Sequence, residues 1–495
     1  MLPYSALLAV VIPGFVGLGL LAFRRNVMDH AGWIATAATL ISVFLMLNMA
    51  TDVLDNYNQN QSPLLFEYSW IKPINVSFGF IVDVVNLPLG LIVALVSTLA
   101  SFYSIQYMAG EKDLPAYYAS LLLFMMGMMG VMLSNNLIQF YLFWELMLIP
   151  SYLLIALWGT SENRLRIGFK YFIFTHVGAL SMLLGILAIY SYTGTFNLVN
   201  LPQLIHLVPP EMVNVIFILL CFGFFVKMAV FPVHTWLPDA HSEAPTPISA
   251  MLSGLMVKSG AYGIARVLLG IFGSTMAFAS DFLTALAVIT IAYGGLMALA
   301  QTDIKRLLAY SSISQLGYIL FGLGTASSLG VTGGLLHMVN HAVSKSLLFL
   351  CAGILIHETK TRDISQLGGL MSRMPVTSAA CVIGAFSLIG IPPLNGFWSE
   401  WMIFGGGLSA GKIAITFIGV ASTLVTAGYY LWFIWRVFFG TPSPLVEANN
   451  VNDPSVLQLT PIVILATLCL VWGLFPGSML IFIRSAAELL TGLGG

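Results

Sequence analysis

The chain has 495 residues, of which 58% are hydrophobic and only 8% are charged, and its mean hydropathy is +0.93. A soluble domain carries about a quarter charged residues, so the composition excludes a soluble protein and indicates an integral membrane protein. The 19 Lys and Arg residues nearly balance the 20 Asp and Glu residues, which excludes nucleic acid as a partner and gives no general attraction to anionic lipid.

An apolar stretch of about 20 residues spans a bilayer as an α-helix, and the sequence contains fourteen such stretches. Charges, Pro and Gly clusters or polar turns bound each stretch. We therefore expect an all-α integral membrane protein. Its crossings are predicted at about 4–23, 31–50, 78–108, 115–133, 137–158, 167–193, 212–231, 246–270, 281–300, 304–325, 331–357, 376–404, 412–439 and 459–484.

Basic residues predict the orientation, because they concentrate at the cytoplasmic ends of membrane helices. Of the 19 Lys and Arg residues, twelve, among them Lys305, are assigned to the side that follows the first crossing. Four, among them Arg266, are assigned to the opposite side, and three lie inside crossings. This bias predicts an even number of crossings in a multi-pass protein of the plasma membrane, with both termini outside. The longest polar stretch, at about 51–77, is expected to cap the outer face.

Five charged residues fall inside the predicted crossings, where a charge costs roughly 2.5–3.5 kcal/mol on insertion scales. They are Glu145, Lys227, Lys258, Lys345 and Glu400. Structural ion pairs are one explanation, but three lysines and two glutamates cannot all pair with one another. An ammonium group that depends on a nearby carboxylate can be switched between its charged and neutral forms. These residues are therefore predicted to move protons.

Two histidines accompany Lys345 on the same predicted crossing. His337, His341 and Lys345 are spaced i, i+4 and i+8, which places them on one helix face over about 12 Å. Histidine titrates near neutral pH and can pass a proton through either ring nitrogen. His176, in the middle of the sixth crossing, is a weaker candidate. A metal ion is the other use of an HxxxH pattern, but no third ligand stands at a matching position, so no metal site is expected.

Two crossings are interrupted by prolines next to these charges. The seventh runs from Lys227 into FPVHTWLPDAHSEAPTP, and the twelfth contains GIPPLNGFWSE, which ends at Glu400. Proline removes a helical hydrogen bond, and within a membrane the freed carbonyl group needs protein or a water-filled cavity. The breaks lie five helices apart, so we expect helices 4–8 and 9–13 to be repeats that are inserted in opposite orientations.

These repeats divide the chain into four regions. Helices 1–3 occupy residues 1–110, the first repeat 111–270, the inverted second repeat 271–440, and helix 14 with the C-terminus 441–495. Half-channels from opposite sides of the membrane would then meet near Lys258, His337 and His341.

The motifs resemble the antiporter-like, proton-translocating subunits of respiratory complex I and of multi-subunit cation/proton antiporters. The resemblance covers about residues 78–440 and implies fourteen helices, with inverted repeats 4–8 and 9–13 and broken helices 7 and 12. It rests on the Trp144–Glu145 pair, the stretch from Lys227 to Arg266, QTDIKRLLAYSSISQLGY at 301–318 and TRDISQLGGLMSRMP at 361–375.

Among the complex I subunits, the chain is most similar to the M type, which occurs in NADH-quinone oxidoreductases and in archaeal deazaflavin (F-420) dehydrogenases. Glu400 stands where the M type has glutamate, and only about ten residues follow helix 14, whereas the L type has a long lateral helix. HMVNHAVSKSLLF and PTPISA are closer to L-type and antiporter sequences. A sodium/proton antiporter component therefore stays as the alternative, and a structural anchor without transport is a third.

The resemblance implies the proton-pumping, non-redox subunit of a translocating NADH- or deazaflavin-dependent quinone or phenazine reductase. Its partners would be antiporter-like and small hydrophobic membrane subunits and a peripheral redox arm. The four cysteines are far apart without a CxxC pattern, so no cofactor is expected in this chain. The implied proton path consists of the Glu145–Lys227 pair, the central relay Lys258, the carriers His337, His341 and Lys345, and the terminal site Glu400.

Overall fold

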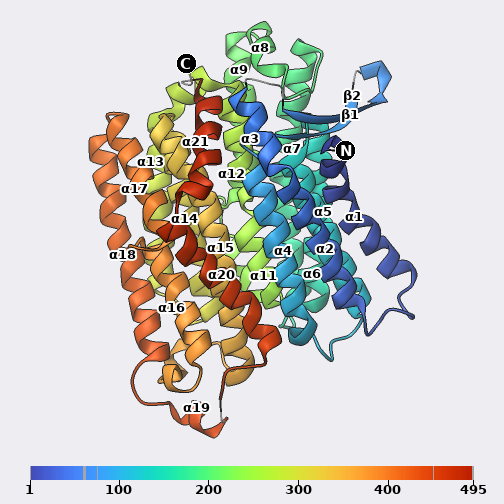
Figure 1. Cartoon of the computed structure of the whole chain (residues 1–495). Helices are drawn as coiled ribbons and strands as arrows, with labels where there is room; N and C mark the ends of the chain where they lie inside the picture. The colour runs from blue at the N-terminus through green and yellow to red at the C-terminus, as the bar shows by residue number, and fades with distance from the viewer. Residues whose placement is uncertain (1, 60–62, 75, 450, 493–495) are drawn as a thin grey trace.

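The computed structural model describes residues 2–59, 63–74, 76–449 and 451–492. Its long helices run side by side in one bundle (Figure 1). The start of α1 (Leu2–Ala22) and the end of α21 (Gly477–Thr491) lie at the same end of this bundle. Two chain ends on one side of the bundle agree with an even number of membrane crossings.

The N-terminal region contains a β-hairpin that the sequence does not predict. The N-terminal region comprises α1, α2 (Ala31–Asn48), α3 (Ala50–Asn58), the two hairpin strands β1 (Leu64–Ile71) and β2 (Val76–Val82), and α4 (Leu87–Tyr107). The predicted start of the third crossing at 78 is therefore wrong, and the all-α expectation misses this two-stranded antiparallel sheet. An apolar run of seven residues fits a strand or a buried helix equally well by periodicity.

Asp83 directly follows β2 and forms the turn that leads into α4. Its Oδ1 atom accepts hydrogen bonds from the backbone N–H groups of Val85 and Asn86, at 3.0 and 3.2 Å. This Asx-type turn lets the chain change direction before the helix begins, and Pro88 follows in the first turn, where its missing N–H is tolerated.

The seventh predicted crossing is broken, as expected. Helix α9 ends at Met228, one residue after Lys227, and Ala229 adopts the left-handed conformation with φ +55°. The chain resumes as a helix only at α10. The first repeat comprises α5 (Leu114–Leu133), α6 (Leu137–Trp158), α7 (Arg164–Thr193), the short α8 (Leu201–Leu204), α9 (Pro210–Met228), α10 (Leu237–Glu243), α11 (Thr246–Met251) and α12 (Lys258–Gly263).

The eighth predicted crossing, 246–270, contains two π-helical turns. The first, Leu252–Met256, lies between α11 and α12, and the second, Ile264–Leu269, follows α12. Lys258 is the first residue of the α-helical segment between them. Such turns frequently mark functional sites. We refer to 246–269 as helix 8.

The twelfth predicted crossing is also broken. Helix α16 ends at Ile389, Gly390 follows with φ +79°, and α17 begins at Asn395. The second repeat comprises α13 (Gly273–Leu299), α14 (Ile304–Gly324), α15 (Ser328–Thr359), α16 (Pro375–Ile389), α17 (Asn395–Ser409) and α18 (Ile413–Phe438).

The last predicted crossing, 459–484, is two helices instead of one. Helix α20 (Val456–Leu474) ends before Pro476, and α21 begins at Gly477. Proline cannot continue the hydrogen-bond ladder of α20, and α19 (Pro444–Ala448) precedes both helices at the opposite end of the bundle (Figure 1).

Twelve helices in the described ranges are long and apolar enough to cross a membrane. The other two predicted crossings, 246–270 and 376–404, are divided into shorter pieces by the π turns and by the second break, so the count of fourteen stays a prediction. Neighbouring helices pack in a similar order in both repeats: α5 on α6, α6 on α7 and α7 on α9, then α13 on α14, α14 on α15, and α15 on both α16 and α17, the two halves of the twelfth crossing.

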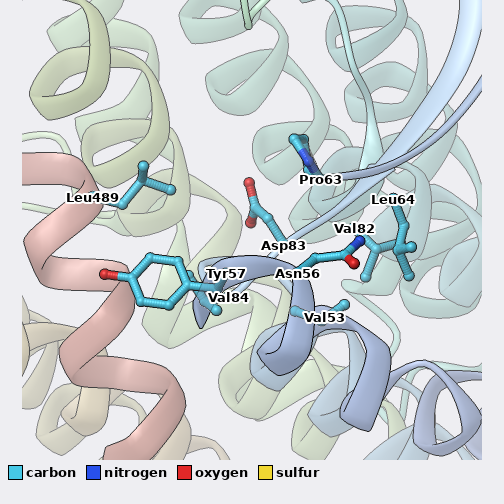
Figure 2. Close-up of a pocket in the computed structure, with 9 residues that line it drawn as sticks. All are labelled: Val53, Asn56, Tyr57, Pro63, Leu64, Val82, Asp83, Val84 and Leu489. Carbon is cyan, nitrogen blue, oxygen red and sulfur yellow. The ribbon is translucent and has the colours of Figure 1, made fainter. Parts of the chain in front are cut away.

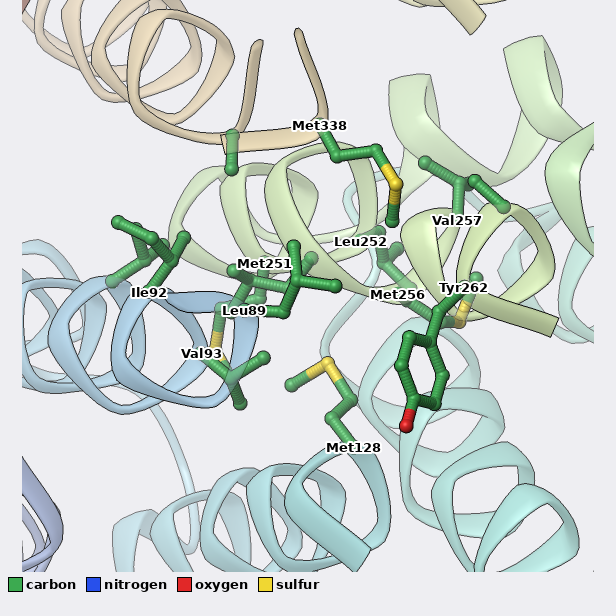
Figure 3. Close-up of a cluster of buried hydrophobic side chains, with 14 of the residues drawn as sticks. Leu89, Ile92, Val93, Met128, Met251, Leu252, Met256, Val257, Tyr262 and Met338 are labelled. Carbon is green, nitrogen blue, oxygen red and sulfur yellow. The ribbon is translucent and has the colours of Figure 1, made fainter. Parts of the chain in front are cut away.

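An apolar core surrounds helix 8. Figure 3 shows side chains of α4, α5 and α15 around helix 8, among them Met128 of α5 and Met338 of α15, together with Met256 of helix 8. All three are buried. Charged groups on helix 8 and α15 therefore lie within close-packed hydrocarbon, where only hydrogen bonds or nearby charges stabilise them.

Candidate functional site

Six of the seven predicted residues are buried. The exception is Glu145, whose side chain on α6 is 20% exposed. The buried six come from four helical segments: Lys227 from α9, Lys258 from helix 8, His337, His341 and Lys345 from α15, and Glu400 from α17. The structure thus places three of them on broken or irregular helices and three on the enclosed helix α15.

Glu145 contacts His176, which was the weaker histidine candidate. The Oε2 atom of Glu145 lies 3.1 Å from Nδ1 of His176 on α7. The imidazole is 36% exposed, so this acid–histidine pair lies on the side of the bundle. The other carboxylate oxygen, Oε1, is buried without a hydrogen-bond partner among the described residues.

Lys227 does not form the expected contact with Glu145. The described residues contain no ion pair between the two, although the carboxylate is close enough for its charge to act on the amine. The Nζ atom has no hydrogen-bond partner in the described part of the chain and lies 5.5 Å from the ring centroid of Trp144. An aromatic face attracts a cation. The contact that the structure shows for the Lys227 amine is therefore with the ring of Trp144 and not with the carboxylate of Glu145.

Lys258 is held by the first π turn of helix 8. Its Nζ atom donates a hydrogen bond of 2.5 Å to the carbonyl oxygen of Ser253. A π turn shifts the backbone hydrogen bonds by one residue, and the side chain of Lys258 bonds to a carbonyl oxygen within this turn.

Helix α15 carries all three residues of the predicted stripe, but they have different surroundings. The rings of His337 and His341 lie 6.0 Å apart. Both ring nitrogens of His337 are hydrogen-bonded, to Gln315 and Ser399, whereas neither nitrogen of His341 has a partner within the described ranges. Of the two histidines, His341 is therefore the one with free proton-accepting positions.

The ammonium group of Lys345 donates to three acceptors. They are the carbonyl oxygen of Leu308 at 3.0 Å, the hydroxyl of Tyr430 at 3.0 Å and the hydroxyl of Ser311. Three donated bonds use all hydrogens of an ammonium group. Three hydrogen-bond acceptors thus surround the amine of this completely buried lysine.

Glu400 lies against the break in the twelfth crossing. A Cβ atom on Gly390 would lie 2.6 Å from Oε2 of Glu400, and the φ of +79° strains any other residue, so a substitution here would displace the carboxylate. Oε1 of Glu400 is buried and has no partner among the residues that the structure describes. The carboxylate thus occupies the space that the missing side chain leaves.

The sequence did not reveal four other buried polar residues near these sites. Lys305 was counted at the membrane edge, yet it is buried and donates a 2.5 Å bond to the carbonyl oxygen of Ala244. His241 on α10 is buried, and its ring nitrogens lack partners in the described ranges. Gln315 and Ser399 are uncharged and give no signal beyond their polarity in an apolar run.

A nearly buried ion pair, separate from the seven predicted residues, lies toward the end of the bundle that carries the hairpin. Nη1 of Arg266 donates to Oδ2 of Asp83 at 2.6 Å, and both side chains are nearly buried. Figure 2 shows Asp83 at a pocket between α3, the hairpin and α21, which Tyr57 and Leu489 also line. Arg266, which the sequence assigns to the membrane edge, forms this pair from helix 8.

Two family models match the chain. The model described as "NADH:quinone oxidoreductase/Mrp antiporter, TM" matches residues 134–426. The model described as "NADH-Ubiquinone oxidoreductase (complex I), chain 5 N-terminus" matches residues 70–118.

Three curated relatives are similar over nearly the whole chain. The F(420)H(2) dehydrogenase subunit M of Methanosarcina mazei is 31% identical over 100% of this chain and 99% of its own length. The NADH-quinone oxidoreductase subunit M of Rickettsia felis is 32% identical over 93% of this chain and 92% of its own. An Na(+)/H(+) antiporter subunit of Alkalihalophilus pseudofirmus is 36% identical over 95% of this chain, which spans only 60% of that longer protein.

Solved structures share the fold. A chain of respiratory complex I from Thermus thermophilus with bound NADH is 26% identical and matches with a TM-score of 0.87, covering 100% of both chains. A chain of the Mrp complex from Dietzia sp. DQ12-45-1b matches with a TM-score of 0.89 at 24% identity, over 99% of this chain and 97% of that one.

Proposed function

Because this chain belongs to the family of NADH:quinone oxidoreductase and Mrp antiporter membrane subunits, we propose that it is the proton-translocating subunit of a complex I-like dehydrogenase. It moves protons through Glu145, Lys227, Lys258, His337, His341, Lys345 and Glu400, while neighbouring subunits reduce a quinone-type acceptor. The electron donor is NADH or a reduced deazaflavin. The complex lies in the plasma membrane with both termini of this chain outside, and its peripheral arm supplies the redox energy.

One observation carries this proposal. The titratable groups extend from a partly exposed pair, Glu145 and His176, into a fully enclosed interior. A partly exposed acid–histidine pair at bilayer depth is costly against lipid, so the side of the bundle at Glu145 suits a neighbouring membrane protein of the complex. A displacement of Glu145 by such a neighbour would remove the negative charge that stabilises the ammonium form of Lys227, and the released proton would enter the interior.

The test is proton uptake by the purified complex in liposomes, measured together with oxidation of the donor. Glu145→Gln should leave donor oxidation largely intact and lower the number of protons moved per donor, because a positioned acid or base contributes roughly 10²–10⁴-fold to proton transfer. Glu162→Gln, in the exposed turn after α6, is the matched control. An unchanged proton ratio in Glu145→Gln would contradict the assignment.

A second candidate is a component of a sodium/proton antiporter, which the 36% identity to the antiporter protein of Alkalihalophilus pseudofirmus favours. Sodium-driven proton movement without any electron donor, together with co-purifying antiporter subunits, would identify it. If the chain were only an anchor, Lys227→Ala and Lys258→Ala would leave the proton gradient unchanged.

A further inference from the structure

His337 connects the two halves of the broken twelfth crossing. Its Nε2 atom lies 2.7 Å from Oε1 of Gln315, and the Nε2 atom of Gln315 donates to the carbonyl oxygen of Leu388 at 3.1 Å, in the last turn of α16. Its Nδ1 atom lies 2.9 Å from the hydroxyl of Ser399, which also reaches the carbonyl oxygen of Gly396 at 2.9 Å, in the first turn of α17. Each ring nitrogen is thus linked to one side of the break.

The Gln315 side fixes which ring nitrogen carries a proton in the neutral histidine. A carbonyl group only accepts hydrogen bonds, so the amide nitrogen of Gln315 must face Leu388 and its amide oxygen must face His337. His337 therefore donates from Nε2. When the imidazole is neutral, Nδ1 is an acceptor and must receive its hydrogen bond from the hydroxyl of Ser399.

The hydroxyl of Ser399 has a single hydrogen, and this hydrogen has two possible acceptors. Asn340 Nδ2 already donates to the same oxygen at 3.2 Å. With neutral His337, the hydroxyl donates to Nδ1. When Nδ1 gains a proton, it becomes a donor, and the Ser399 hydroxyl must rotate and donate to the carbonyl oxygen of Gly396 instead. One proton on His337 therefore makes or breaks one hydrogen bond at the start of α17.

Titratable groups of the proposed proton path surround His337 and link this exchange of hydrogen bonds to that path. Lys258 on helix 8 is close enough for its charge to act on the imidazole. Tyr318 of α14 stacks on the ring at 5.8 Å, and His341 lies 6.0 Å away on α15 itself. Glu400 follows Ser399 directly on α17. His341, with free ring nitrogens, suits proton transfer through water, whereas both nitrogens of His337 are occupied.

We infer that Ser399 is a positioning residue, which transmits the protonation state of His337 to the first turn of α17 and so to Glu400. This inference rests on the proposed function, because it concerns the order in which Glu400 responds to a proton that arrives on α15. The step needs no bond change other than addition of a proton to Nδ1, and the rotation of the hydroxyl redistributes hydrogen bonds only. Gln315 has the complementary role of holding the tautomer.

The test compares Ser399→Thr with Ser399→Val in the intact complex in liposomes. Threonine and valine have the same shape, and only threonine retains the hydroxyl. We expect Ser399→Thr to keep the wild-type ratio of protons moved to donor oxidised and its dependence on pH. Ser399→Val should lower the ratio about tenfold, as expected for loss of a hydrogen bond to a charged group, and its pH profile should be flat.

Ser409→Ala is the matched control, because Ser409 lies on the same helix and its hydroxyl donates to the carbonyl oxygen of Gly406 at 2.9 Å, three residues earlier. Ser399 has the same local bond to Gly396, but Ser409 has no histidine partner among the described residues. If the Thr and Val variants pump alike while wild type and Ser409→Ala pump, the role of Ser399 is refuted. A wild-type complex that moves no protons would instead refute the proposed function.

Discussion

The Nδ1 atom of His176 lies 3.1 Å from the Oε2 atom of Glu145 on the side of the helix bundle, and no comparable contact joins Glu145 to Lys227 among the described residues. The acid that the family resemblance pairs with a lysine is thus held by a histidine. This arrangement leaves Lys227 without a direct partner and makes His176 part of the site.

His176→Phe is therefore expected to weaken proton pumping without abolishing it. Glu145 would lose the neighbour that fixes its position, which corresponds to about a tenfold effect, the lower end of the value of one hydrogen bond to a charged group. Protons moved per donor oxidised is the measured quantity. The control is His357→Phe, because His357 lies 3.0 Å from Glu358 in an exposed pair. Equal effects of the two substitutions would argue against a role for His176.

Lys227→Met should raise stability and lower transport at the same time. The Nζ atom is buried without a hydrogen-bond partner in the described ranges, and exchange of an unpaired buried charge for a thioether of similar length should stabilise the folded state by at least about 1 kcal/mol. The melting temperature of the complex and its proton uptake are the two readouts. Lys412→Met removes a lysine that is bonded to Asp281, and no gain in stability is expected there.

Gly390→Ala is expected to impair transport through Glu400. Alanine at φ +79° is strained by about 1 kcal/mol, and its Cβ atom would lie 2.6 Å from the carboxylate of Glu400. Gly411→Ala tests the strain alone, because Gly411 has φ +74° and open space around it. Both variants should melt at slightly lower temperatures, but only Gly390→Ala should move fewer protons. Similar proton uptake by both variants would contradict the prediction that Gly390 leaves the space in which the Glu400 carboxylate lies.

Tyr430→Phe should destabilise the charged form of Lys345. The phenol supplies one of its three acceptors, at 3.0 Å, and such a bond to a charged group is worth about 1.5–3 kcal/mol. Lower thermal stability and slower proton uptake are expected together. The adjacent Tyr429 is a close control, because its buried hydroxyl has no partner in the described part of the chain. Tyr429→Phe should be neutral or slightly stabilising. A larger loss of stability and of proton uptake in Tyr429→Phe than in Tyr430→Phe would contradict the role of Tyr430 at Lys345.

The sequence predicts the membrane helices well because hydrocarbon thickness determines their length. It also predicts both breaks, since Pro232 and Pro392 cannot continue a helix. It misses the β-hairpin and the π turns of helix 8. Apolar residues at 76–82 suit a strand as well as a helix, and a π turn such as Leu252–Met256 depends on packing and has no composition of its own.

For the candidate site, the sequence identifies charges more readily than their partners. Glu145, Lys227 and Lys258 are evident because a charge in an apolar run is rare. The partners Ser399, Gln315 and Tyr430 are neutral residues from distant segments, and only the fold brings them to the histidines and to Lys345. The burial of Lys305 was not predicted for a different reason, because a place at the start of a helix is typical of a residue at the membrane edge.

Helix α15 is enclosed by protein almost along its entire length, with 94% of an apolar 18-residue segment buried, whereas the corresponding value for α18 is 33%. Lipid chains adapt to apolar side chains of any shape, but close-packed helices do not. Substitutions on α15 must therefore be matched by changes in neighbouring helices. Among relatives, positions on α15 should vary little and in a correlated manner, and those on the outer face of α18 should vary freely as long as they stay apolar.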